Sequence, residues 1–246
     1  RRLSSAASDV YKRQPLVVKA DGLASGKGVF IPDSKDECFK AAELILSGKF
    51  GNSGNVIVLE EKIEGPEVSV FALCDGERFI LLPTAQDHKR LMEEDKGPNT
   101  GGMGAYSPAP LLTKDLLDRI IKEIIEPTID ELNKKNIDYK GVIYFGLMIT
   151  KFGPKVIEYN CRFGDPECQT IMPLMDQNFV FLLEKCSMGN LTGSETIEAT
   201  DKVSGCVIAT SKGYPHEYKT GFPIEIGNID SYDCQIFDSG LSLIHI

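Results

Sequence analysis

Residues 156–167 read VIEYNCRFGDPE, and this stretch places two oxygen donors at the end of a predicted strand. Glu158 and Asn160 are two positions apart, and side chains of a strand alternate between its faces, so we expect both on one face. Two hard oxygen donors suit Mg²⁺, which keeps its other positions for water and substrate phosphates. Arg162 offers a planar fork for a carboxylate or a phosphate. The alternative is a plain ion pair between Glu158 and Arg162.

A glycine-rich turn near the other end of the chain is a second candidate site. Residues 15–20 form a short run that predicts a strand, and the sequence GLASGKG follows at 22–28. The backbone N–H groups of such a loop can surround phosphate oxygens. Its spacing is not that of a P-loop. A simple flexible turn is therefore the alternative.

Acidic residues on both sides of a tight turn form a third candidate. Residues 60–67 read EEKIEGPE and follow a predicted strand. One of these carboxylates could accept hydrogen bonds from a ribose, as acidic residues do in other nucleotide sites. A solvated acidic edge is the other interpretation.

The hydrophobic pattern predicts a mixed α+β fold. A helix is expected over 34–46, with Phe39, Ala42, Ile45 and Leu46 at helical spacing. A second helix begins at Thr113, and Pro127 is expected to bend it or to end its first segment. Two further helices are expected over 165–175 and 178–188. The other predicted strands cover 55–63, 67–74, 78–82, 142–150, 155–160, 205–210 and 223–226.

Residues 84–110 lack a clear period and contain several glycines and prolines. We expect a long loop here, and a loop of this length inside a compact domain is usually functional or disordered.

Composition excludes several classes of protein. The 246 residues carry a net charge of −9, which argues against a nucleic-acid binder because phosphate backbones are held by clustered Lys and Arg. No apolar run reaches the roughly 18 residues of a membrane span. The seven cysteines include no Cys-x-x-Cys pair, so neither a zinc ribbon nor a disulfide framework is expected. A reducing, cytoplasmic compartment is the natural expectation.

Taken in order, the lysine-bearing strand, glycine loop, acidic turn and strand-end Glu-x-Asn resemble an ATP-grasp enzyme. The resemblance is closest to the phosphoribosylamine–glycine ligase family, also called glycinamide ribonucleotide synthetase, and it runs from about residue 15 to 240. It implies a small lid subdomain, a larger antiparallel-sheet core and part of a C-terminal β-rich domain. The segments that carry it are VKADGLASGKGV at 18–29, QDHKR at 86–90, GPNTGGMGAYSPAP at 97–110 and VIEYNCRFGDPE at 156–167.

The resemblance implies an ATP-dependent carbon–nitrogen ligase of purine biosynthesis. Its substrates would be glycine and 5-phosphoribosylamine, joined through a glycyl phosphate, with Mg²⁺ or Mn²⁺ beside the ATP. Neither nucleic acid nor membrane would be a partner. The parent protein is expected to be monomeric or part of a multifunctional purine-pathway chain.

The resemblance also assigns roles to residues of this sequence. Lys19 would neutralise the α- and β-phosphates of ATP, main-chain groups of Glu60 and Ile63 would hold the adenine, and Glu67 would bind the ribose. Glu158 and Asn160 would hold the metal, and they are the only obvious protein ligands, which predicts weak metal binding until nucleotide arrives. The lid over the phosphates would be formed by Ala24, Ser25, Gly26 and Gly28.

Four further residues would surround the acyl phosphate and the incoming amine, together with the loop at 98–104. These are Arg162, Asp87, His88 and Lys89. The histidine side chain in general titrates near neutrality, so a general-base role for residue 88 is possible in principle. A binding role or a merely solvated ring is the alternative for this histidine.

The domain boundaries follow from the same comparison of motifs. We expect a lid subdomain at 15–75, a core with the metal site at 76–195 and the start of a C-terminal domain at 196–240. Residues 1–14 and 241–246 have the character of non-native ends. The chain is expected to be a fragment that binds ATP and turns over poorly or not at all.

Two alternative functions stay open at this point. One is another ATP-grasp carboxylate–amine ligase of purine metabolism, which the identity of the stimulating acid would distinguish. The other is a nucleotide-binding module that lacks complete catalytic machinery.

Overall fold

The computed structural model describes residues 16–22, 24, 28–94, 96–176, 178–195, 197, 201–229 and 231–239. The chain divides into two compact units, the first ending at Gly65 and the second beginning at Pro66. All assigned strand pairs are antiparallel, and helices pack beside them, so the expected α+β class is confirmed.

The described residues of the first unit form a three-stranded sheet and an α-helix. Its strands β1 (Leu16–Ala20), β2 (Val29–Phe30) and β3 (Ile57–Glu61) lie in the order β2-β1-β3. Helix α2 (Lys35–Leu44) continues into a π-helical turn, Ile45–Lys49, and a 3₁₀ turn, Gly51–Gly54. The small core of this unit contains Val18, Ala41 and Ile45.

Helix α2 begins where the sequence predicts but buries a different stripe. The Ser34 side chain accepts a hydrogen bond from the Glu37 backbone N–H and so caps the helix. Phe39 is 67% exposed and Leu46 54% exposed, so the predicted apolar face was wrong at both positions. The residues that pack against the core of the first unit instead are Cys38, Ala41, Ala42 and Ile45, which also have helical spacing.

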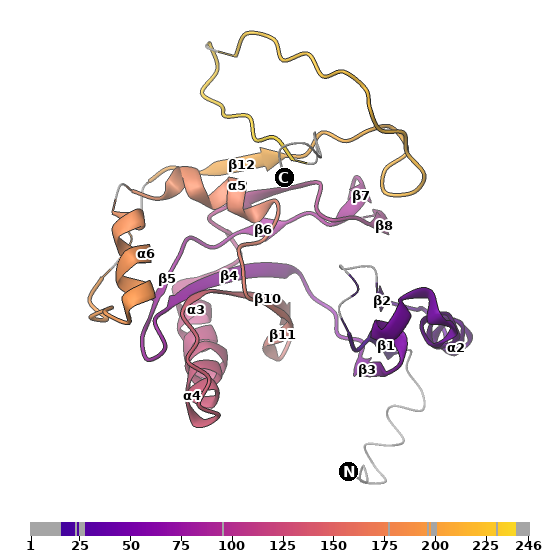
Figure 1. Ribbon diagram of the computed structural model, residues 1–246, viewed down its shortest axis with the longest axis horizontal. Coiled ribbons are helices and arrows are strands. Elements are labelled where there is room, and N and C mark those ends of the chain that lie inside the picture. Colours follow the sequence, from indigo (N-terminus) through magenta and orange to yellow (C-terminus); the bar gives the residue numbers. More distant parts are fainter. Residues whose placement is uncertain are drawn as a thin grey trace. The chain divides into compact units, whose positions relative to one another are not determined.

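The second unit is built on a four-stranded sheet in the order β11-β10-β4-β5 (Figure 1). These strands are β4 (Glu67–Cys74), β5 (Phe79–Leu81), β10 (Gly141–Thr150) and β11 (Gly153–Asn160). The expected boundary at residue 75 placed β4 with the lid, but β4 pairs along its whole length with β10. The division at Gly65 keeps that pairing within one unit.

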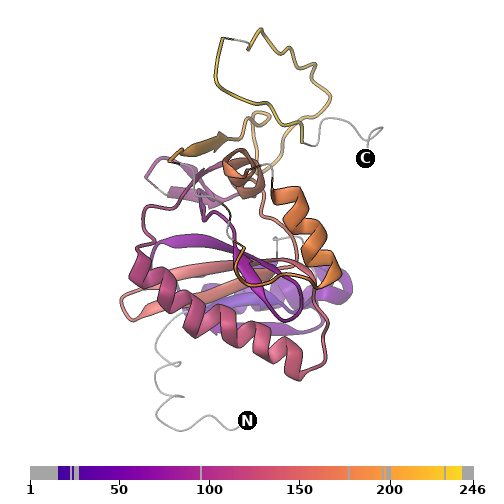
Figure 2. The ribbon, with the colours of Figure 1, turned by 90° about the vertical axis from the view of Figure 1, so that its left-hand side faces the viewer.

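Helices cover both faces of this sheet, as the two views of the ribbon show (Figures 1 and 2). Helices α3 (Lys114–Ile120) and α4 (Glu126–Lys134) cover the face of Val70 and Phe145. A π-helical turn, Ile121–Ile125, separates them just before Pro127, which cannot donate a backbone hydrogen bond. The opposite face is covered by α6 (Phe179–Met188) together with α5 (Glu167–Ile171) and the 3₁₀ turn Met172–Leu174.

The long loop expected at 84–110 was wrong, because this stretch contains four short strands. They are β6 (Gln86–Asp87), β7 (Arg90–Met92), β8 (Lys96–Asn99) and β9 (Gly104–Ser107). Strand β9 pairs with β6 and with the distant β12 (Ser204–Val207), while β7 pairs with β8. Strands of two to four residues, rich in Gly and charged side chains, leave no periodic signal in the sequence.

After β12 the described residues form no further strand, so the strand expected at 223–226 was wrong. Phe222, Ile224 and Ile226 are exposed there, and a strand requires a neighbour for its backbone groups. Among the described residues, no helix has both the length and the apolar character that crossing a membrane requires.

Candidate functional site

One end of a face of the large sheet is polar. In the pairing register, Gly146 on β10 lies opposite Glu158 on β11 and opposite Ser69 on β4. Glu67 and Ser69 share a face of β4, and Glu158 and Asn160 share a face of β11, because each pair is two residues apart. Farther along, the same face is apolar and packs on α6. The polar side chains are therefore concentrated at the sheet end that α6 leaves uncovered.

Gly146 provides room for the Glu158 side chain. A Cβ atom at position 146 would lie 2.7 Å from Glu158 Cγ and 3.1 Å from Tyr144 Cε1. Contacts under 3.0 Å are too close for real Cβ atoms, so a larger residue at 146 would displace the carboxylate or its strand.

The side chain of Lys89 bridges two of the carboxylates. Its Nζ lies 3.1 Å from Glu67 Oε2 and 3.5 Å from Glu158 Oε1. These two glutamates lie on strands separated by β10. Among the described residues, Glu158 therefore forms its ion pair with Lys89, and the alternative ion pair between Glu158 and Arg162 does not form.

The backbone of Lys89 is fixed by the glycine-rich segment that follows β8. The Lys89 carbonyl accepts hydrogen bonds from the backbone N–H of Thr100 at 2.7 Å and from its hydroxyl at 2.8 Å. The neighbouring His88 exchanges backbone hydrogen bonds with Met103 and Gly104. Residues 88–89 and 100–104 thus form one hydrogen-bonded arrangement.

The charges around Lys89 favour its ammonium form. Burial by itself lowers the pKa of Lys89, but the nearby carboxylate of Glu67 and, less strongly, that of Glu158 outweigh burial and raise the pKa well above its usual range. The charged ammonium form of Lys89 is therefore favoured over the neutral amine.

Asp87 lies beside this cluster in an unusual environment. Its Oδ1 is buried and has no hydrogen-bond partner among the described residues. Burial, and then the negative charge of Glu167, raise the pKa of Asp87 to about 7. A Cβ atom on Gly102 would lie 2.9 Å from Asp87 Oδ1 and 2.5 Å from Pro166 Cδ, so the glycine loop packs directly against this carboxyl group.

Three buried polar groups behind the cluster were not among the residues expected at the site. Ser69 Oγ donates a 2.9 Å hydrogen bond to Glu167 Oε1 and lies 3.1 Å from the Tyr144 hydroxyl. Burial, followed by the charge of Glu167, raises the pKa of Tyr144. A serine within the apolar run of β4 was the available signal, since a buried hydroxyl needs a partner.

Two other expected acceptor-side residues lie at the surface. The His88 ring is exposed and packs on Tyr106, with ring centroids 5.3 Å apart. Arg162 is exposed and donates a 2.7 Å hydrogen bond to the Phe163 carbonyl.

The first unit contains the remaining expected nucleotide residues. Lys19 Nζ lies 2.5 Å from Glu60 Oε2 on the neighbouring strand. Gly28 is buried, and a Cβ atom there would lie 2.7 Å from Ala24 Cβ, so close packing requires glycine. Ile63 is half-buried just after β3. Ser25 and Gly26 lie outside the described residues.

The donor set at the end of β11 fits a divalent cation only in part. Glu158 and Asn160 supply two oxygen ligands on one face. Within the described part of the chain, no group of three or more His, Cys, Asp or Glu is placed to hold a metal ion. Most of the coordination positions would thus be filled by water and by the phosphates of a bound nucleotide.

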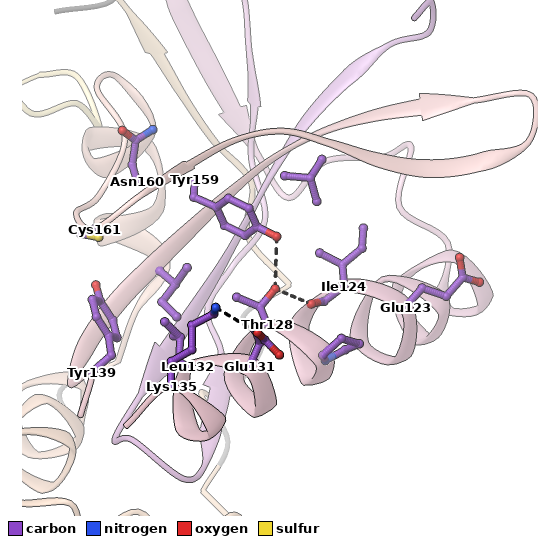
Figure 3. Close-up of a pocket in the computed structure, with 13 residues that line it drawn as sticks. Glu123, Ile124, Thr128, Glu131, Leu132, Lys135, Tyr139, Tyr159, Asn160 and Cys161 are labelled. Atoms are coloured by element: carbon purple, nitrogen blue, oxygen red, sulfur yellow. Dashed lines mark hydrogen bonds and ion pairs between the residues drawn. The ribbon is translucent and has the colours of Figure 1, made fainter. Parts of the chain in front are cut away.

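A cavity of about 510 Å³ lies on the other side of the sheet, between α4 and strands β10 and β11 (Figure 3). Tyr159 points into it, toward the Thr128 hydroxyl 3.2 Å away, whereas the Asn160 side chain points away from the helix. Tyr159 and Asn160 are adjacent in β11, and adjacent side chains of a strand point to opposite faces of the sheet. Of the candidate site residues that the structure describes, only Asn160 borders this cavity, so the proposed reaction belongs to the polar face of the sheet.

Comparison with known proteins identifies the family. Residues 3–168 match the family described as phosphoribosylglycinamide synthetase, ATP-grasp (A) domain. The chain belongs to this family. The ATP-grasp fold predicted from the sequence motifs is therefore confirmed.

Related proteins of known function agree with this assignment. The chain is 48% identical over 211 residues to phosphoribosylamine–glycine ligase of Caldanaerobacter subterraneus subsp. tengcongensis, covering 85% of this chain and 50% of that protein. It is 46% identical over 230 residues to the trifunctional purine biosynthetic protein adenosine-3 of Gallus gallus. This match covers 93% of this chain and 23% of that protein. The chain thus spans about half the length of such ligases and about a quarter of the trifunctional protein.

Solved structures give the same result. The crystal structure of phosphoribosylamine–glycine ligase from Thermotoga maritima matches with a TM-score of 0.77 at 36% identity, covering 87% of this chain and 54% of that one. The crystal structure of an L-amino acid ligase from Bacillus licheniformis matches with a TM-score of 0.55 at 20% identity. This match covers 87% of this chain and 47% of that one. The second likeness concerns the fold alone.

Proposed function

We propose that this chain is the ATP-binding part of a phosphoribosylamine–glycine ligase. The observation that carries the proposal is the cluster of Glu67, Lys89, Glu158 and Asn160 at one sheet end, in a chain of the ATP-grasp (A) domain family. A carboxylate for a ribose, a cation for phosphates and two oxygen ligands for a metal are the groups that nucleotide binding needs.

The proposed reaction joins glycine to 5-phosphoribosylamine. A carboxylate oxygen of glycine attacks the γ-phosphorus of ATP, and the bond to the β-phosphate oxygen breaks to release ADP. The amine of phosphoribosylamine then attacks the carbonyl carbon of glycyl phosphate and loses a proton. The C–O bond to phosphate breaks, so the products are glycinamide ribonucleotide, ADP and phosphate.

The chain's own residues contribute charge and position. Lys19 would bind the α- and β-phosphates beneath a lid of Ala24, Ser25, Gly26 and Gly28, and Glu67 would accept hydrogen bonds from the ribose. When bound to Glu158 and Asn160, Mg²⁺ or Mn²⁺ supplies the charge neutralisation on which phosphoryl transfer depends. The adenine would be held by main-chain groups of Glu60 and Ile63.

The acceptor side of the site is proposed for the residues around Asp87. Its carboxyl group lies beside Gly102 and carries a pKa near neutrality, which suits a group that takes a proton from an amine. Lys89, His88 and Arg162 would bind the anionic groups of the acyl phosphate and the phosphoribosyl substrate.

Calorimetric binding of ATP, with and without Mg²⁺, tests the proposal directly. We expect metal-dependent binding that Glu158→Gln weakens at least tenfold. Glu126→Gln, which changes the same charge on the exposed side of α4, should leave binding within twofold. Equal binding by Glu158→Gln and the wild type would reject the metal assignment.

Release of ADP then tests the choice of substrate. Release that requires both glycine and phosphoribosylamine would support the ligase, whereas stimulation by a different carboxylic acid would indicate another ATP-grasp ligase. ATP binding with no acid-dependent release would indicate a nucleotide-binding module.

A further inference from the structure

Lys89 occupies the position between two carboxylates that a cation would otherwise fill. Its Nζ is 3.1 Å from Glu67 Oε2 and 3.5 Å from Glu158 Oε1, across the strand that carries Gly146. Since residue 146 has no side chain, the ammonium group and the Glu158 carboxylate meet over the middle strand. The lysine thus links β4 and β11 by charge, above a strand that contributes no side chain at that point.

This lysine balances an acidic environment. Glu67, Asp87, Glu158 and Glu167 all act on Lys89 or on its neighbours through their charges. The Lys89 ammonium group lies within ion-pair distance of both Glu67 and Glu158. Lys89 is therefore the counter-ion that these two carboxylates share.

In this position Lys89 competes with a metal ion for Glu158. A divalent cation binds carboxylate oxygens at about 2.0–2.6 Å and would lie within a few ångströms of the Lys89 ammonium. Two cations at that distance repel each other strongly away from bulk water. A phosphate group offers the ammonium an alternative anionic partner, so nucleotide can relieve the conflict.

We propose that Lys89 is an exchangeable counter-cation, whose ammonium group holds Glu158 in the nucleotide-free chain and moves to phosphate oxygens when metal and nucleotide bind together. The inference rests on the proposed metal role of Glu158 and Asn160. It predicts that the site binds a divalent cation only weakly without nucleotide. The fixed backbone of Lys89, held by Thr100, confines the exchange to the side chain.

The test is binding of Mn²⁺ alone, measured by the electron paramagnetic resonance signal of free Mn²⁺. We expect Lys89→Gln to bind Mn²⁺ at least tenfold more tightly than the wild type, and Lys89→Arg to resemble the wild type. Lys134→Gln removes the same charge from an exposed position on α4 and should change the affinity by less than twofold. Adding Glu158→Gln to Lys89→Gln should abolish the gain.

Binding of Mn²⁺ together with ADP tests the second half of the exchange, in which Lys89 moves to phosphate oxygens. Here Lys89→Gln should bind more weakly than the wild type, because a contact with phosphate oxygens is lost. A Lys89→Gln variant with unchanged affinity for Mn²⁺ alone, or a gain that persists without Glu158, would overturn the proposal. If the single variant does not fold, the charge-balanced Lys89→Gln/Glu67→Gln variant allows the same comparison.

The two proposals fail in different ways. The wild-type chain could bind Mn²⁺ together with ATP while Lys89→Gln leaves the affinity for Mn²⁺ alone unchanged. This result would reject the exchange but support the proposed function. Wild-type chain that shows no metal-dependent binding of ATP would reject the proposed function itself.

Discussion

At the scale of single residues, the candidate site depends on groups whose charges are set by their neighbours. Lys89 and Glu158 form an ion pair because Gly146 has no side chain and leaves room for the Glu158 carboxylate. Asp87 differs from both, because its buried Oδ1 has no partner among the described residues and its pKa is raised to about 7. These are local consequences of packing, which substitution of one residue can test.

Asp87→Asn is expected to stabilise the fold at high pH. The pKa of Asp87 is about 7 in the folded chain against an ordinary value of 3.8, so the folded state keeps its proton where the unfolded state loses it. The unfolded state then binds fewer protons, and wild-type stability falls as pH rises from about 4 to about 7. The variant should be more stable than wild type by on the order of 2 kcal/mol at pH 8, about half the full linkage value because Asp87 keeps some contact with water.

Urea unfolding at several pH values measures this difference. Asp118→Asn, which makes the same change at an exposed position on α3, is the matched control. A difference between Asp87→Asn and wild type that stays constant from pH 4 to pH 8 would contradict the raised pKa.

At the scale of elements, the α3–α4 helix holds one face of the large sheet. Its buried stripe includes Ile120, Ile125 and Ile129, which pack against Val70 and Phe145. Burial of such side chains is the main contribution that a helix makes to a small domain. The helix carries none of the candidate site residues, so its role is to support the strands that do.

Ile125→Ala should therefore lower the free energy of unfolding by about 2–5 kcal/mol, because it opens a cavity at a fully buried position. Lys122→Ala, exposed on the same helix, should change it by less than about 0.5 kcal/mol. Denaturant unfolding of both variants measures the effect. A loss below 1 kcal/mol for Ile125→Ala would show that the helix packs less tightly than its burial indicates.

At the scale of the whole molecule, two units with very different cores share one chain. Among the described residues, the first unit has a core cluster of three buried residues, whereas the second has two clusters of twelve. Stability grows with the apolar surface removed from water, so the units should open at different free energies.

Native-state hydrogen exchange should resolve this difference. Amides of β1 and β3 are expected to exchange through openings of lower free energy than those of β4 and β10, whose central residues Val70 and Phe145 are fully buried. Mass spectrometry of peptic peptides, followed over time in dilute denaturant, measures both sets. Exchange of all four strands through one opening of equal free energy would show that the units unfold together.

The sequence by itself determined most of the fold. Strands β1, β4, β5, β10 and β11 and helices α2, α3 and α6 follow from hydrophobic period, caps and turn residues, which are properties of adjacent residues. The shared face of Glu158 and Asn160, the proposed metal ligands, also follows from the sequence, since two positions on one strand share a face. The motifs were specific enough to identify the family.

Only the tertiary structure decided how these parts meet. Within 84–110, strand β9 pairs with β12, almost a hundred residues away, and the short length of the strands in this stretch leaves no local period. The bridge from Lys89 to Glu67 and Glu158, and the buried contact of Ser69 with Glu167, each join residues distant in sequence. Charge and burial depend on distance in space, which the register of the sheet sets and no local pattern encodes.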